Sequence, residues 1–196
     1  MIYKIAAIAV LVLFYGIYFI KMFLQKRQGI QTRQIGKRKE RGLHIVENVM
    51  SVATLSIVPV QLVSVIIDWS WLPSSARFTG FLTGMLGDLI FLISVITMKN
   101  NWRAGIPESS KTELVTEGIY RFSRNPAFVG FDFMYIGVCL LFCNPLTIAF
   151  SVFSIVMLHL QILQEEKYLT EIFGESYVQY KKIVFRYLGR QQQRKV

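Results

Sequence analysis

The chain has 196 residues, of which 53% are hydrophobic and 17% are charged, and its formal net charge is +10. This composition excludes an ordinary soluble globular domain, in which about a quarter of the residues are charged. The positive charge alone would also suit a nucleic-acid-binding protein, so the positions of the basic residues have to decide between the two classes.

Four apolar stretches are long enough, or nearly so, to cross the roughly 30 Å of hydrocarbon in a bilayer. They cover residues 2–24, 43–67, 78–98 and 127–163, and the last is about twice as long as one span requires. Read as a hairpin, that stretch brings the number of predicted membrane helices to five. The sequence therefore predicts an all-α, polytopic membrane protein with about five transmembrane helices, the last two forming a tight hairpin.

The first stretch is expected to remain in the protein as a membrane anchor. Its apolar core is longer than that of a cleavable signal peptide. No small-residue cleavage site follows it before the basic run that begins at Lys21.

The basic residues gather in three segments. All of the 22 Lys and Arg except Lys4 and Arg77 lie within residues 21–41, 99–124 or 167–195. With five helices of alternating direction, the three segments fall on one side of the membrane. The positive-inside rule identifies that side as cytoplasmic and leaves the N-terminus outside. The first segment is interpreted as a topogenic contact with anionic lipid rather than as a nucleic-acid patch.

Short connections and small residues characterise the middle of the chain. The external connection, residues 68–73, carries Trp69 and Trp71 at the depth of an aromatic belt and is too short for a further domain. In the third span, the spacing of Gly80 and Gly84 predicts close packing against another helix.

Two cysteines, Cys139 and Cys143, lie one turn apart in the fourth span. Because the chain has no second cysteine pair for a zinc site, they are interpreted as packing residues. No metal site is predicted.

The double-length stretch is expected to fold back on itself. Pro126 suits the first turn of a helix, and Asn144-Pro145 is a turn signal that leaves two spans of roughly 26 Å each. Such a hairpin returns the chain to the side that it left. Arg124 at its start and the pair Glu165-Glu166 at its end are therefore predicted to be neighbours.

The chain is predicted to stay helical after the last span. The pattern beyond Leu163 indicates a helix that leaves the bilayer and stops at Gly174. Residues 175–185 form a second amphipathic pattern, which is typical of a short cytoplasmic helix that lies on the membrane or caps a site.

The hairpin would bring opposite charges together beside aromatic residues. Arg124 and the pair Glu165-Glu166 would meet near Tyr120, Phe122 and Phe128. A carboxylate and aromatic faces hold a sulfonium or ammonium cation, and an arginine holds an anionic group. S-adenosylmethionine presents both kinds of group. Taken one by one, however, the same residues are also consistent with topogenic arginines and surface acids at the end of a span.

Five short motifs follow one another in the C-terminal half of the chain. They are Leu-Val-Thr-Glu-Gly-Ile-Tyr at 114–120, Arg-Asn-Pro-Ala-Phe-Val-Gly at 124–130, Cys-Asn-Pro at 143–145, Glu-Glu at 165–166, and Phe-Gly-Glu-Ser-Tyr followed by Tyr-Lys-Lys at 173–182. In order and spacing this half resembles the isoprenylcysteine carboxyl methyltransferase family and its phospholipid methyltransferase relatives. The N-terminal half is similar only as a set of membrane spans.

The resemblance implies that the protein is an integral membrane methyltransferase and that S-adenosylmethionine is held in a membrane-embedded pocket. Carried over position by position, it implies cofactor contacts from Glu113, Leu114, Val115, Tyr120, Asn125, Pro126, Ala127, Phe128 and Glu166. Asn125 stands where the family often has His, and Phe128 stands where it often has Tyr. Residues 161–164 contain no arginine, although the eukaryotic enzymes carry a substrate-contacting arginine there.

Methyl transfer from a sulfonium to a carboxylate annihilates charge, so a dry pocket favours the transition state and no general base is needed. An amine acceptor would have to lose a proton, for which Glu165 or His159 is a candidate base. Of the two intramembrane acids, Asp88 and Asp132, the latter is expected to lie nearer the cofactor. The predicted catalytic residues are Arg124, Glu165 and Asp132.

The sequence thus predicts transfer of a methyl group from S-adenosylmethionine to a lipid or a lipidated small molecule or peptide, as in isoprenylcysteine carboxyl O-methylation. The alternatives are a phospholipid amine N-methyltransferase, an NADPH-dependent sterol-type membrane reductase and a non-enzymatic scaffold. The expected partners are the bilayer and the acceptor, with no nucleic acid. One membrane domain, 1–196, is expected, made of a three-helix scaffold (1–98), a cofactor-binding methyltransferase core (99–189) and a basic tail (190–196).

Overall fold

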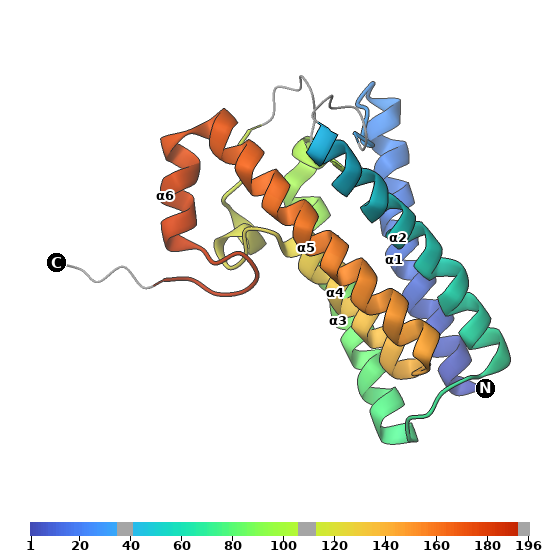
Figure 1. Ribbon diagram of the computed structural model, residues 1–196. Helices are drawn as coiled ribbons and strands as arrows, with labels where there is room; N and C mark the ends of the chain where they lie inside the picture. The colour runs from blue at the N-terminus through green and yellow to red at the C-terminus, as the bar shows by residue number, and fades with distance from the viewer. Residues whose placement is uncertain (35–40, 106–112, 192–196) are drawn as a thin grey trace.

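The computed structural model describes residues 1–34, 41–105 and 113–191, and these residues form a helical bundle (Figure 1). Strand-like pairing is limited, within these ranges, to isolated β-bridges between Arg33 and Ala104 and between Val184 and Arg190. The elements in chain order are α1 (Ile2–Arg27), α2 (Arg41–Ile67), α3 (Ser74–Met98), the 3₁₀ turns η1 (Lys99–Asn101) and η2 (Gly118–Arg121), α4 (Pro126–Leu141), α5 (Pro145–Phe173) and α6 (Glu175–Ile183).

Four helical segments are long and apolar enough to cross a bilayer, namely Ile2–Arg27, His44–Ile67, Ser74–Asn101 and Pro145–Phe173. The fifth predicted span is α4, an apolar helix of 16 residues. At 1.5 Å per residue it is about 24 Å long, somewhat less than the hydrocarbon thickness. The all-α, polytopic prediction is confirmed, and the chain is an integral membrane protein.

Asn144 fixes the reversal between α4 and α5. Its side-chain oxygen accepts hydrogen bonds from the backbone amides of Leu146 and Thr147 at 3.1 and 3.0 Å. The backbone amide of Asn144 donates to the Thr147 hydroxyl at 3.1 Å. Pro145 occupies the first turn of α5, where its missing N–H costs nothing. The hairpin predicted at Asn144-Pro145 is therefore confirmed.

Helix α5 continues without a break past Glu165 and Glu166 to Phe173. It ends at Gly174, whose φ of 53° lies in the left-handed region that glycine adopts at low cost. Helix α6 follows directly and stands beside that end of α5 (Figure 1). The predicted stop at Gly174 and the short helix after it are confirmed.

Helices α3 and α4 touch through glycines. A Cβ atom added to Gly87 would lie 2.6 Å from the Met134 amide nitrogen, and one added to Gly80 would lie 2.7 Å from the Gly137 carbonyl oxygen. The two backbones therefore lie in direct contact, as small residues allow in membrane helices. Gly84, the other predicted glycine, has Val10 of α1 beside it, and its backbone faces Gly137 of α4.

Arg77 ties together the end of the bundle that carries the α2–α3 turn. Its guanidinium pairs with Asp68 at 2.8 Å, and its Nε donates to the Leu141 carbonyl at 2.9 Å. The guanidinium lies 4.5 Å from the ring centroid of Tyr3 and 4.7 Å from that of Phe142. These contacts connect α1, the α2–α3 turn, α3 and the end of α4.

At the opposite end, the chain after α1 pairs with the chain after α3. The Gln25 side chain is buried and donates to the Trp102 carbonyl at 3.0 Å, while its oxygen accepts from the Thr32 hydroxyl at 2.7 Å. The Ala104 amide donates to the Thr32 carbonyl at 3.0 Å. Residues 35–40 of the predicted basic segment and 192–196 of the predicted tail lie outside the described residues.

Candidate active site

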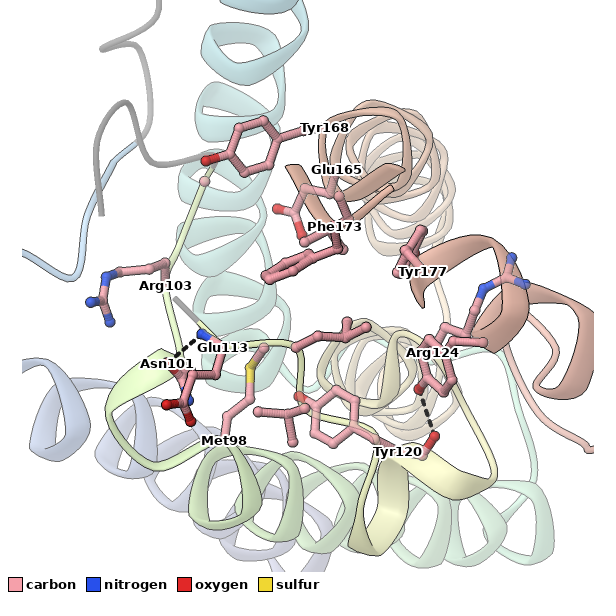
Figure 2. Close-up of a pocket in the computed structure, with 15 residues that line it drawn as sticks. Met98, Asn101, Arg103, Glu113, Tyr120, Arg124, Glu165, Tyr168, Phe173 and Tyr177 are labelled. Carbon is pink, nitrogen blue, oxygen red and sulfur yellow. Dashed lines mark hydrogen bonds between the residues drawn. The ribbon is translucent and has the colours of Figure 1, made fainter. Parts of the chain in front are cut away.

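A cavity lies at the end of the bundle that is opposite Arg77, between the ends of α3 and α5, the segment 113–121 and α6 (Figure 2). Its empty volume is about 680 Å³ with its open mouth included. The lining residues are Met98, Asn101, Arg103, Gly105, Glu113, Leu114, Val115, Tyr120, Arg124, Glu165, Tyr168, Leu169, Phe173, Tyr177 and Tyr180.

Two local features hold the 113–121 wall in place. The Asn101 side-chain oxygen accepts a hydrogen bond from the Glu113 amide at 3.1 Å. Gly118 has a φ of +55°, and a Cβ atom there would lie 3.0 Å from the Thr97 side chain, so the turn requires glycine. The turn buries Tyr120, which is 4% exposed, at the base of the cavity.

Helix α6 forms a second wall with two tyrosines. The Tyr180 hydroxyl donates to the Tyr120 carbonyl at 2.6 Å, which joins α6 to the 113–121 wall. The Tyr177 hydroxyl is buried and has no hydrogen-bond partner among the described residues. Burial raises the pKa of both phenols, so both remain protonated at neutral pH.

Glu166 is the centre of a cluster that we call the Glu166 clasp, formed by Glu166, Arg124, Asn125 and Arg186. Oε1 of Glu166 accepts hydrogen bonds from the Arg124 guanidinium at 2.8 and 3.1 Å and from the Asn125 side-chain amide at 3.1 Å. Oε2 accepts from Arg186 at 3.0 and 3.2 Å. The side chains of Arg124 and Glu166 are only 8% and 4% exposed. The predicted meeting of the two ends of the hairpin is confirmed by this ion pair.

The Glu166 clasp also holds the segment after α6 against α4 and α5. Arg124 donates through its side chain to the Val184 carbonyl at 2.9 Å and through its amide to the Phe185 carbonyl at 3.1 Å. The Gly189 amide donates to the Phe122 carbonyl at 2.7 Å. In Figure 1 this segment runs from α6 back toward α5 before it turns away.

Six of the predicted site residues line the cavity: Glu113, Leu114, Val115, Tyr120, Arg124 and Glu165. The other six do not line it. Asn125 and Glu166 belong to the clasp, and Pro126, Ala127, Phe128 and Asp132 lie in the first two turns of α4. Cofactor contacts from these positions, and a catalytic role for Asp132, stay predictions.

The directions of the charged side chains define the character of the cavity. In Figure 2 the guanidiniums of Arg103 and Arg124 point away from its centre, while Glu165 faces it from α5. Glu165 accepts a hydrogen bond from Gln161 at 3.1 Å and forms no ion pair among the described residues. The interior is therefore apolar and aromatic, with a carboxylate on one side.

Asp132 and His159 belong to a separate polar region on α4 and α5. One carboxylate oxygen of Asp132 is buried without a hydrogen-bond partner in the described part of the chain. His159 Nδ1 lies 2.6 Å from the Tyr187 hydroxyl, and the two rings are stacked. A base role for His159 stays a prediction, and in the structure its ring contacts Tyr187 of the C-terminal segment.

Sequence reasoning did not assign several lining residues, among them Asn101, Arg103, Tyr168, Tyr177 and Tyr180. The expectation that the helix after Gly174 might cap a site pointed to α6 without naming its side chains. The three-residue spacing of Tyr177 and Tyr180 puts both on one helix face, which was the available signal. Nothing in the sequence around Arg103 indicated that it lines the cavity.

The fold and the cavity together define a class of protein: a polytopic helical membrane protein with an open cavity, lined by apolar, aromatic and charged side chains, at one end of its bundle. Residues 81–171, which include α4, most of α3 and all but the last two residues of α5, match the model of the isoprenylcysteine carboxyl methyltransferase (ICMT) family. Over this segment, which is a little less than half of its length, the chain is similar to the ICMT family.

Curated relatives are similar to about half of the chain. Protein-S-isoprenylcysteine O-methyltransferase from Dictyostelium discoideum is 29% identical over 126 residues, which are 61% of this chain and 53% of the relative. The protein of that name from Xenopus laevis is 32% identical over 109 residues, 54% and 38% of the two chains. The B form from Arabidopsis thaliana is 33% identical over 99 residues, 49% and 50%. The matches thus span about half, or less, of the length of these relatives.

Proposed function

We propose that this chain is an S-adenosylmethionine-dependent methyltransferase that methylates the carboxylate of an isoprenylated cysteine or a similar lipidated acceptor. The observation that carries the proposal is the cavity itself. Its walls come from the family segment, through Met98, Tyr120 and Glu165, and from α6. The curated relatives to which the chain is similar are named protein-S-isoprenylcysteine O-methyltransferases.

The residues of the cavity fit S-adenosylmethionine. Met98, Leu114, Leu169 and Phe173 offer an apolar slot for a flat adenine ring. The Glu165 carboxylate suits a cationic group, and the unpartnered Tyr177 hydroxyl is free to bond a polar one. The backbone amides of Leu114 and Val115 donate to no partner within the described residues, so they can donate hydrogen bonds to the edge of the adenine ring.

Bound S-adenosylmethionine supplies an electrophilic methyl group on a sulfonium. The chain would contribute an apolar, aromatic cavity with Glu165 beside the cationic centre. Charge is annihilated when a carboxylate accepts the methyl group, so no residue has to act as a base. Arg124 acts as a positioning residue, because its guanidinium is engaged by Glu166 and by the Lys181 and Val184 carbonyls.

We further propose that the cavity faces the cytoplasm and that the N-terminus lies outside. The support is the clustering of basic residues in segments 21–41, 99–124 and 167–195. Labelling of single cysteines introduced at Lys26 and at Ser70 in sealed vesicles tests this. Labelling of both positions from the same side would contradict it. The division into a scaffold, 1–98, and a methyltransferase core, 99–189, is proposed on the same pattern.

Incubation of the purified chain in lipid nanodiscs with tritiated S-adenosylmethionine and N-acetyl-S-farnesylcysteine tests the activity. We expect a base-labile methyl ester on the prenylcysteine. Glu165→Gln should lower its formation at least tenfold, because a carboxylate beside the cation is lost, while Glu171→Gln, an exposed change on the same helix, should not.

Base-stable label in a phospholipid would instead assign an amine N-methyltransferase. Binding of NADPH without binding of S-adenosylmethionine would assign a reductase. Either result would overturn the proposed reaction, and calorimetry of cofactor binding to the same sample separates a missing cofactor site from a wrong choice of acceptor.

A further inference from the structure

A second, more open hollow lies between the end of α5, α6 and Arg186. Its empty volume is about 760 Å³, including open space, and it shares no lining residue with the cavity. The residues that line it are Leu163, Glu166, Lys167, Thr170, Glu171, Lys181 and Arg186.

The hollow lies beside a surplus of positive charge. In the Glu166 clasp, one carboxylate is shared by two guanidiniums, so the clasp carries one positive charge that no described residue balances. The hydrogen bonds to Glu166 raise the pKa of Arg186, which therefore stays charged. Lys167 and Lys181 are exposed and form no ion pair within the described residues. Lys181 lies 5.9 Å from the Tyr177 ring centroid.

The hollow also lies at the boundary between apolar and polar surface. Leu163 is 37% exposed and stands one helical turn before Lys167 on α5. Next to Arg186 in the chain are two exposed apolar residues, Phe185 at 51% and Leu188 at 57%. Cations on one side and apolar side chains on the other match the two parts of a lipid.

A contact with α5 indicates how deep the C-terminal segment, the chain after α6, lies relative to the bilayer. The Tyr187 hydroxyl lies 2.6 Å from Nδ1 of His159, which is two turns closer to the middle of the membrane span than Glu166. The residues that flank Tyr187 therefore reach the level of the bilayer rather than standing above it. The exposed apolar side chain of Phe122 joins them, since the Gly189 amide donates to its carbonyl.

We propose that this hollow binds the phosphate of an anionic phospholipid, with Lys167, Lys181 and Arg186 around the headgroup and the acyl chains beside Leu163 and the C-terminal segment. A soluble phosphate would use the same cations but would gain nothing from the apolar side chains. The bound lipid would fix the orientation of α6 and the C-terminal segment, which together cover the cavity.

Native mass spectrometry of the full chain in detergent tests the proposal with two added lipids, dioleoylphosphatidylglycerol and dioleoylphosphatidylcholine. We expect the anionic lipid to be retained preferentially. The double variant Lys167→Gln/Lys181→Gln should lower its affinity roughly tenfold or more, because each basic residue at a membrane surface contributes about fivefold. The control Arg121→Gln/Lys182→Gln removes the same charge from exposed positions outside the hollow and should change it much less.

Three results would overturn the proposal. They are equal retention of the two lipids, equal losses in the two double variants, and complete displacement of the anionic lipid by excess inorganic phosphate, which would assign a site for a free anion. The unfolding midpoint of each variant, which should match that of the wild-type protein, shows that the fold is intact. None of these readouts depends on methyl transfer.

Discussion

The two ends of the helical bundle are each fastened by an arginine, but the fastenings differ in burial and in what they hold. At one end Arg77 and Asp68 are 15% and 42% exposed, and they join helices that short turns already connect. At the other end Arg124 and Glu166 are 8% and 4% exposed, and they hold a segment from the end of the chain.

The two ion pairs therefore have different roles: the Arg77–Asp68 pair adds a small amount of stability, and the Arg124–Glu166 pair determines where a segment lies. A solvent-exposed ion pair adds little to stability, typically less than about 1 kcal/mol. A buried pair has to offset the desolvation of both charges, and its loss leaves one charge buried without a partner. The Glu166 clasp therefore specifies where the C-terminal segment lies, and with it the position of α6 at the cavity. The Arg77–Asp68 ion pair, in contrast, reinforces the α2–α3 turn.

Glu166→Ala should have the largest effect. The change leaves two guanidiniums without their carboxylate and should lower the free energy of unfolding by about 3–5 kcal/mol. Unfolding of the purified protein in mixed micelles measures this. The matched control is Glu171→Ala, which removes an exposed carboxylate from the same helix. Equal unfolding midpoints for Glu166→Ala and Glu171→Ala would show that the buried Glu166 contributes no more than an exposed carboxylate, which would contradict the contrast drawn between the two ends of the bundle.

Arg124→Ala and Arg186→Ala should lower the free energy of unfolding by different amounts. Arg124 is buried and also donates to the carbonyls of Lys181 in α6 and of Val184 just after it, whereas Arg186 is 37% exposed. We expect the first change to cost several times more than the second, which should cost about 1 kcal/mol or less. Hydrogen exchange of the amides of 184–190 is the more direct readout. Similar exchange in both variants would show that Arg124 does not hold this segment.

Tyr180→Phe and Tyr177→Phe form a matched pair with a smaller expected effect. Tyr180→Phe removes the hydrogen bond to the Tyr120 carbonyl and should cost about 1 kcal/mol. Tyr177→Phe removes a hydroxyl that has no partner among the described residues, so stability should be unchanged or slightly higher. Its affinity for S-adenosylmethionine, measured by calorimetry, should nevertheless fall. Loss of stability in Tyr177→Phe would contradict this assignment.

Asp68→Asn should have the smallest effect, and the effect should depend on pH. The hydrogen bond from Arg77 lowers the pKa of Asp68 below its usual value, so the carboxylate stabilises the fold above its unfolded-state pKa of about 3.9. That stability is lost as the pH falls through the lower folded-state pKa. The difference in unfolding midpoint between wild type and variant should be small at pH 7 and should vanish in acid. A constant difference would exclude the ion pair as its cause.

Much of the fold could be predicted because its determinants are local in the sequence. Apolar length identified the membrane helices, Asn144-Pro145 identified the reversal, and Gly174 identified the end of α5. The meeting of Arg124 with Glu166 followed from the hairpin alone. Helix α4 is shorter than a standard span because the chain before Pro126 forms a wall of the cavity instead of continuing a helix.

The site was predicted only in part because its walls depend on contacts that are distant in sequence. The amide of Glu113 meets Asn101, and the Tyr180 hydroxyl meets a carbonyl sixty residues earlier. The division between Glu165, which lines the cavity, and Glu166, which lies in the clasp, depends on the rotation of α5 about its axis. No pattern in a pair of adjacent glutamates reports that rotation.

The glycine contact between α3 and α4 has a mechanical consequence. Because backbone atoms of Gly87 and Gly80 lie against those of α4, neither helix can slide or rotate against the other without a steric collision. These two helices act as a fixed frame. Entry and exit of any occupant of the cavity must therefore depend on displacement of the wall at 113–117 or of α6 with the C-terminal segment, and mobility measurements on the described residues should find their largest amplitudes in those two places.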